Sequence, residues 1–173
     1  KASILAAQTM VVVEDLYRPY RPKRRTRATI AKEKGLEPLA KLILEQKTEE
    51  PLENTAKDYV SQEKEVANEQ EALAGACDIL AEMISDEADY RMEIRRRTMK
   101  KGQIVSSAKD EKASSVYEKY YDASEPVAQI ASHRVLALNR GEKEKFLTVK
   151  IEAPEEEILR YLEKRIIRKD NNP

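Results

Sequence analysis

The residues with the clearest capacity for chemistry lie in the segment LYRPYRPKRRTR, residues 16–27, called the basic ribbon below. Six of its twelve residues are Arg or Lys, and two are Pro. Arginine and lysine bind phosphate groups through charge-assisted contacts that release counterions, and interleaved tyrosines can stack on unpaired bases. The ribbon therefore predicts weak binding of RNA or single-stranded DNA, with these candidate contact residues: Arg18, Tyr20, Arg21, Lys23, Arg24, Arg25 and Arg27.

Two other interpretations of the basic ribbon stay open. Residues 18–34 carry eight basic side chains against one acid, Glu33, whereas residues 49–89 carry thirteen acids against Lys57 and Lys64. An acidic block of this size can accept the ribbon internally, and a partner protein can do the same. The ribbon can also lie free in water. Between these interpretations we expect partial docking with a residual exposed basic face, because RPYRP is stiff enough to lie against a surface while the helical turns of KRRTR point successive arginines in different directions. The 32 basic and 32 acidic residues cancel, so no whole-molecule field steers the chain toward nucleic acid or a membrane.

The sequence gives little support for catalysis or for a bound cofactor. His133 is the single histidine, and the four glycines stand alone at 35, 75, 102 and 141, so neither a histidine metal cluster nor a glycine-rich phosphate loop is present. Ser132 precedes His133, but the spacing of the sequence indicates no third residue that would complete a catalytic triad with them. We expect no enzyme activity, no catalytic residue, no metal site, no cofactor and no small-molecule substrate.

Composition points to a helical protein with a thin core. Of the 173 residues, 37% are charged and 5% are aromatic, which favours long helices over a barrel or sandwich. The longest apolar run is MVVV at 10–13, and the N-terminus lacks a signal-peptide pattern, so we expect a cytoplasmic protein without a membrane span. The chain has no initiator Met and opens in a helical pattern, from which we expect a fragment of a longer protein.

Local signals in the first third of the chain predict three helices. The first runs from about Ser3 to Tyr17, and the prolines after it should leave RPYRP extended. Thr26 is a plausible N-cap for the second helix, which ends at Gly35. Pro38 suits the first turn of the third. The last two helices form a helix-turn-helix-like pair.

A long acidic helix should follow from about residue 68. Leucine, alanine and isoleucine recur there at helical spacing with Cys77, which predicts a buried thiol within the stripe Leu73, Ala76, Cys77, Leu80 and Ile84. Ser85 should cap a further helix that ends in RRRTMKK. The cations of that last turn either stabilise the helix dipole or bind an anion.

Two later segments have strand character. QIVSSA (103–108) and FLTVKI (146–151) should pair as a two-stranded antiparallel sheet. Two strands need a helix to pack on, and we expect the C-terminal helix to fill this role. SSVYEKYY and SHRVLALNRG between them should be helical. The predicted fold class is mainly α: a multi-helix array with a helix-turn-helix-like element and a minor two-stranded antiparallel sheet. The expected domains are residues 1–50, with the basic ribbon, and residues 51–173.

Three blocks of the chain resemble the Tex family of bacterial transcription accessory proteins. They are EDLYRPYRPKRRTRATIAKEKGLEPLAKLIL (14–44), EALAGACDILAEMISDEADYR (71–91) and YEKYYDASEPVAQIASHRVLALNRGEKEKFLTVKI (117–151). Tex-like proteins are several times longer and continue into an RNase-H-like domain, helix-hairpin-helix elements and a C-terminal OB-fold RNA-binding module, none of which is visible here. The resemblance implies a helical N-terminal or central piece of a nucleic-acid-binding transcription protein. This piece would act as a scaffold with an auxiliary basic surface, or as a scaffold alone.

Overall fold

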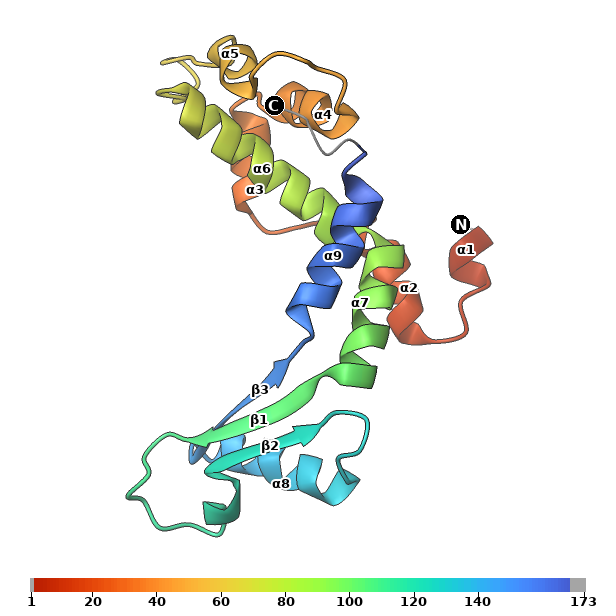
Figure 1. Cartoon of the computed structure of the whole chain (residues 1–173), viewed down its shortest axis with the longest axis vertical. Coiled ribbons are helices and arrows are strands. Elements are labelled where there is room, and N and C mark those ends of the chain that lie inside the picture. Colours follow the sequence, from red (N-terminus) through yellow and green to blue (C-terminus); the bar gives the residue numbers. More distant parts are fainter. Residues whose placement is uncertain (1, 169–173) are drawn as a thin grey trace. The chain divides into compact units, whose positions relative to one another are not determined.

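A computed structural model describes residues 2–168 of the chain, which form a mainly helical protein with one small antiparallel sheet (Figure 1). These residues fall into two compact units. The first comprises the described residues up to Met92 together with those from Tyr161 onward, and the second is Glu93–Arg160. The boundary expected at residue 50 lies inside the first unit and stays a prediction. No helix between residues 2 and 168 combines the length and apolarity needed to cross a bilayer.

The N-terminal part of the first unit contains two helices where the sequence predicted one. They are α1 (Ala2–Leu5) and α2 (Met10–Tyr17), and the hydroxyl of Thr9 caps α2 by accepting the Val12 N–H at 3.4 Å. The predicted extension of RPYRP is wrong for its first three residues, which form the 3-10 turn η1 (Arg18–Tyr20). Proline is compatible with a first helical turn, because an N–H there would have no intrahelical partner.

The predicted helix-turn-helix-like pair is present as α3 (Arg27–Glu33) and α4 (Glu37–Glu45). Thr26 caps α3 by accepting the Thr29 N–H at 3.1 Å, as expected. Gly35 has a φ of +80°, the left-handed conformation that glycine adopts most easily, and this ends the first helix. The short helix α5 (Leu52–Lys57) follows α4.

The predicted burial of Cys77 in α6 (Glu69–Asp86) is wrong, because Cys77 is exposed. The buried face of α6 carries Ala72, Ala76 and Ile79, while Leu73 and Leu80 pack partly against the same core. Small side chains fix this orientation by allowing close packing. A Cβ atom added to Gly75 would lie 2.4 Å from Cδ1 of Leu36, in the turn between α3 and α4.

Two further helices are α7 (Ala88–Lys101) and α9 (Glu155–Ile166). The predicted N-cap role of Ser85 is wrong, because Ser85 lies within α6. Helices α6 and α7 meet at Glu87. In the first unit the side-chain amide of Gln46 holds the end of α9. Its Nε2 donates to the Ile166 carbonyl at 2.7 Å, and its Oε1 accepts the Arg168 N–H at 2.8 Å.

The second unit contains a three-stranded antiparallel sheet in the order β2-β1-β3. Its strands are β1 (Gln103–Ala108), β2 (Asp122–Pro126) and β3 (Leu147–Glu152). The predicted pairing of the first and last strands is confirmed, with Ser106 opposite Val149. The predicted number of strands is wrong, because SSVYEKYY forms only the 3-10 turn η2 (Glu118–Tyr120), and strand β2 follows it.

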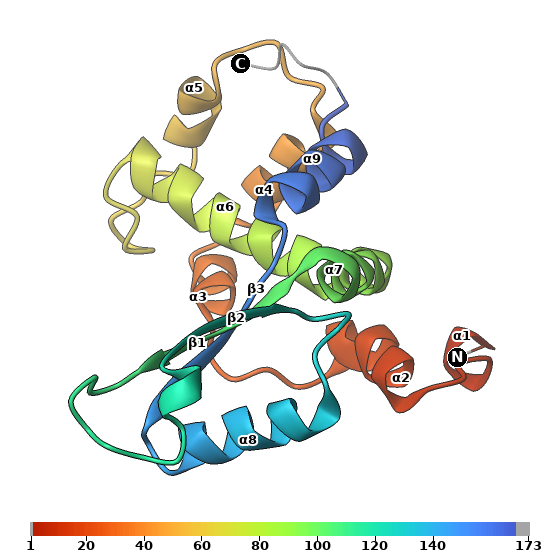
Figure 2. The ribbon, with the colours of Figure 1, turned by 60° about the horizontal axis from the view of Figure 1, so that its bottom comes forward.

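The sheet packs against α8 (Ser132–Lys143) rather than against the C-terminal helix that the sequence favoured (Figure 2). Leu138 of α8 and Leu147 of β3 are buried with Tyr117 and Tyr120 in the core of this unit. Ser106 is also buried, and its hydroxyl donates to the Tyr120 carbonyl at 2.7 Å. This acceptor belongs to η2, so the turn before the missed strand is bonded to the central strand β1.

Candidate nucleic-acid interface

The basic ribbon lies along the C-terminal end of α6, and Asp86 accepts two of its cations. Nε of Arg18 lies 3.0 Å from Oδ1 of Asp86, and the Lys23 ammonium donates to Oδ2 of the same carboxylate. Asp86 is only 8% exposed. A carboxylate so far removed from water requires cationic partners, and Arg18 and Lys23 supply them.

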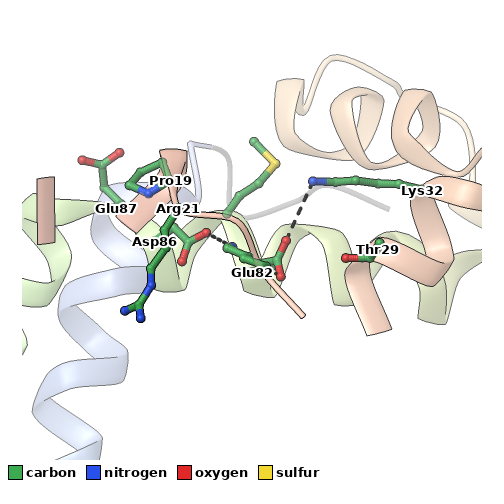
Figure 3. A pocket seen from close by; sticks show the side chains of 9 residues that line it. Pro19, Arg21, Thr29, Lys32, Glu82, Asp86 and Glu87 are labelled. Carbon is green, nitrogen blue, oxygen red and sulfur yellow. Dashed lines mark hydrogen bonds and ion pairs between the residues drawn. The ribbon is translucent and has the colours of Figure 1, made fainter. Parts of the chain in front are cut away.

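One turn earlier on α6, Glu82 makes a second set of contacts. Its carboxylate lies 3.4 Å from Nζ of Lys23 and 3.8 Å from Nζ of Lys32 (Figure 3). The Thr26 hydroxyl donates to it at 3.0 Å while also capping α3. Glu82 and Asp86 are four residues apart and so share one face of α6. Through Lys23 and Thr26, that face of α6 contacts both ends of the segment KRRT, residues 23–26.

The N-terminal side of the ribbon is also fixed. Asp15 of α2 is 3% exposed and accepts Nε of Arg91 at 2.7 Å. The Nη1 of Arg91 donates in addition to the Ser85 carbonyl at 3.3 Å. This partly buried contact joins α2 to the junction of α6 and α7, so the ribbon leaves α2 from a defined point.

Three arginines of the ribbon remain available to a ligand. Arg21, Arg24 and Arg27 are exposed, and within residues 2–168 none of them forms an ion pair or side-chain hydrogen bond. Arg25 pairs with Glu33 at 3.1 Å, but both side chains are more than half exposed, so this pair is weak. Tyr20 is 76% exposed. The ribbon is therefore divided into docked and exposed cations, which is the partial docking that the sequence favours.

A polar groove of about 510 Å³ opens between the ribbon, α3 and α6. Figure 3 shows the Arg21 guanidinium at its edge, with no contact drawn to the Glu82 or Asp86 carboxylate. The groove is lined by basic, acidic, polar and apolar side chains. They are Pro19, Arg21, Lys23, Thr29, Lys32, Glu82, Met83, Asp86 and Glu87. The groove is open and charge-balanced, which suits a solvent-filled contact surface better than an enclosed substrate site.

The second basic run is RRRTMKK (95–101) at the end of α7. Several of its side chains form ion pairs with acids of the same unit. Glu157 of α9 lies 3.8 Å from Nη1 of Arg97 and also accepts the Lys101 ammonium. Arg96 donates two hydrogen bonds of 2.7 Å to Glu93. These bonds, with one from Arg97, lower the pKa of Glu93 from 4.5 to about 2. Ion pairing rather than anion binding therefore explains Arg96, Arg97 and Lys101.

The sequence pointed to an acidic acceptor but not to its residues. Glu82 and Asp86 are two of thirteen acids in residues 49–89, and their four-residue spacing does not set them apart, because Asp78 stands four residues before Glu82 on the same predicted helix. Lys32 also lay outside the predicted set. Residue spacing therefore identifies neither the Glu82–Asp86 pair nor the cations that reach it.

Across residues 2–168 no group of three or more His, Cys, Asp or Glu side chains is arranged to hold a metal ion. His133 is exposed at the start of α8. The expectation that this chain is not an enzyme therefore stays a prediction.

Fold and surface together define a mainly helical module with a partly docked basic segment. The family model described as Tex central region-like matches residues 46–171, and the chain belongs to the Tex family. The resemblance seen in the sequence is thereby confirmed.

Several relatives align with most of this chain. It is 54% identical over 159 residues to the uncharacterized protein YdcI of Bacillus subtilis, covering 90% of this chain and 22% of that protein. It is 39% identical to Protein tex of Bordetella pertussis, covering 86% of this chain and 19% of that one. A human S1 RNA-binding domain-containing protein is 30% identical, covering 86% of this chain and 16% of its own length. The chain thus spans about a fifth of its bacterial relatives.

Proposed function

We propose that this chain is the central helical part of a bacterial, cytoplasmic transcription accessory protein that binds nucleic acid, with RNA preferred. In this proposal the chain acts as a helical scaffold with an auxiliary basic contact surface, and it carries no catalytic residue. Its family membership and the RNA-binding name of its human relative support a nucleic-acid role for the whole protein. The transcription machinery is the expected protein partner.

The observation that carries the proposal is the division of the basic ribbon. Docking on α6 fixes the ribbon in place, and it leaves Arg21, Arg24 and Arg27 exposed beside Tyr20. Arginine side chains on a fixed backbone contact phosphates without reading the base sequence, and an exposed tyrosine adds stacking on unpaired bases. The expected result is weak, sequence-independent binding to single strands.

A salt titration of the 173-residue chain with single-stranded RNA tests the proposal. Three phosphate contacts predict a slope of log affinity against log salt near −2, at about −0.7 per contact. The variant Arg21→Ala/Arg24→Ala/Arg27→Ala should lose most of the binding at low salt. These side chains have no partners among the described residues, so the variant should melt close to the wild-type temperature.

The matched control removes three other cations of the same unit, as Lys41→Ala/Lys47→Ala/Lys57→Ala. These lysines also lie on the surface, in or beside α4 and α5, and each contacts a near neighbour in sequence. The control should bind RNA within about twofold of the wild type, since binding depends on the position of charge rather than its sum. Equal losses in both variants, or no wild-type binding at low salt, would contradict an RNA-contact role for the ribbon.

A second candidate function is a scaffold that makes no nucleic-acid contact of its own. The docking of Arg18 and Lys23 on Asp86 favours it, because those ribbon cations already have partners. On this alternative, the ribbon joins α2 to α6 or docks on a transcription partner. The titration separates the two functions, since only the first predicts affinity that depends on Arg21, Arg24 and Arg27.

A further inference from the structure

We propose that Glu82 and Asp86 form an electrostatic latch that limits nucleic-acid binding, by holding Arg18, Lys23 and Lys32 in contacts that phosphate groups would otherwise make. The inference rests on the proposed function and concerns the regulation of the same surface. In the latched state a single strand meets the exposed cations of the ribbon. In the open state the strand would also contact the three latched cations.

The latch is built from two carboxylates on one face of α6. Asp86 accepts Arg18 at 3.0 Å and also accepts Lys23, while Glu82 lies 3.4 Å from Lys23 and 3.8 Å from Lys32. Lys23 is shared between the two acids and is the central cation of the set. A phosphate group presents anionic oxygens with a similar hydrogen-bonding role, so it competes for the same donors.

The docked cations are accessible enough for such competition. The side chains of Arg18 and Lys32 are 47% and 41% exposed, and that of Lys23 is 27% exposed. The side chains of Glu82 and Asp86 are less exposed, at 18% and 12%. The cations can therefore turn toward a ligand while the carboxylates stay in place, since Arg and Lys have long, flexible side chains.

The groove beside the ribbon gives a phosphate a route to these cations. Lys23 and Lys32 line this groove. Arg21 lines it as well, and among the described residues Arg21 has no ion-pair partner. The lining also includes the carboxylate of Glu87, which with Glu82 and Asp86 repels an anion. Three basic and three acidic side chains thus face the same space. The basic set attracts a strand, and the acidic set weakens its approach.

Removing the latch should increase affinity for RNA. Neutralising both acids, as Glu82→Gln/Asp86→Asn, frees up to three cations while preserving the size and much of the hydrogen bonding of each side chain. In the salt titration with single-stranded RNA, the slope should then steepen from about −2 to about −4, at about −0.7 per added contact. The affinity at low salt should rise on the order of tenfold.

A second substitution distinguishes the latch from a general change of charge. Arg18→Ala/Lys23→Ala is therefore placed in Glu82→Gln/Asp86→Asn, where no buried carboxylate is left without its cationic partners. It should abolish most of the gain in RNA affinity. If that combined variant keeps the whole gain, the latch is wrong.

The matched control is Glu37→Gln/Glu45→Gln, which neutralises two acids of α4 and frees Lys41 and Lys47. It alters the net charge by the same amount and should leave RNA affinity within about twofold. An equal gain in the control would contradict the latch. If Glu82→Gln/Asp86→Asn does not fold, as judged by circular dichroism, Glu82→Gln alone should still give about a third of the slope change, because it frees Lys32 while Asp86 keeps Arg18 and Lys23.

Two failures can be told apart. If the wild type binds RNA and the neutralised variant shows no gain, the latch is wrong and the proposed function stands. If neither protein binds at low salt, the proposed function is wrong, and the latch is overturned with it.

Discussion

Arg18 and Arg21 lie three positions apart in the basic ribbon and have opposite environments. Arg18 contacts the nearly buried carboxylate of Asp86, whereas Arg21 is exposed at the edge of the groove. Both are arginines in the same short motif, so residue type does not distinguish them. Their roles depend on whether a carboxylate of α6 lies within reach, which only the folded chain determines.

Glu93 gives a residue-scale prediction that can be tested by titration. Its pKa is lowered to about 2, mainly by the Arg96 hydrogen bonds, with Arg97 adding to the effect. A folded-state pKa below the ordinary value of 4.5 stabilises the folded protein above about pH 4.5, and that contribution is lost as the pH falls toward 2. The stability difference between wild type and Glu93→Gln should therefore shrink over this range.

Carboxyl chemical shifts in NMR measure the Glu93 titration directly. Arg96→Ala should raise its midpoint toward 4.5, because the largest stabilising contact of the carboxylate is lost. Arg160→Ala serves as a control, since Arg160 pairs with Glu156 instead. A Glu93 midpoint near 4.5 in the wild type would contradict the hydrogen-bonding arrangement.

At the scale of elements, α6 shows which face of a helix the core selects. Ile79 is fully buried while Cys77, two positions earlier, is exposed. Ile79→Ala should lower the free energy of unfolding by about 2–5 kcal/mol, because it leaves a cavity beside the alanines of the α3–α6 contact. Cys77→Ala should change it by less than about 0.5 kcal/mol.

Chemical denaturation measures both variants, and thiol labelling adds an independent check. The native protein should react with a thiol reagent at a rate close to that of the denatured chain, because Cys77 is exposed. Strong protection of Cys77, or equal destabilisation by the two substitutions, would show that the helix presents another face to the core.

Elements with strong local signals were predictable from the sequence. Thr26, Gly35 and Pro38 each act over a few residues, and all three mark the expected helix boundaries in the structure. The pairing of β1 with β3 followed from alternating side chains. In these cases the physical cause lies within a short stretch of chain.

Features that depend on tertiary contacts were not predictable in this way. Tyr117 and Tyr120 sit in a stretch with a helical pattern, yet both are buried in the core of the second unit, and strand β2 follows them. The α6 stripe was misplaced because alanine and glycine, rather than the larger residues, make the closest contacts. Among the ribbon residues, sequence predicted partial docking but not the Glu82–Asp86 acceptor.

At the scale of the whole molecule, two buried clusters suggest two cooperative units. One cluster includes Leu39 and Ile79, and the other includes Leu138 and Leu147. Leu147→Ala should therefore reduce hydrogen-exchange protection more in peptides from residues 103–152 than in peptides from residues 28–79. The control is Ile151→Ala on the same strand, where the side chain is 61% exposed and little should change. Equal loss of protection in both regions would show a single cooperative unit.

The chain has no net charge, so any binding to nucleic acid depends on where its cations lie. The central claim is that the contact falls on the exposed arginines of the basic ribbon. Arginine-specific chemical modification, read by mass spectrometry with and without saturating single-stranded RNA, tests this at each residue. Arg21, Arg24 and Arg27 should react readily in the free protein and be protected by RNA, while the exposed Arg96 and Arg160 should react equally in both samples. Unchanged modification of all three ribbon arginines under saturating RNA would contradict the claim.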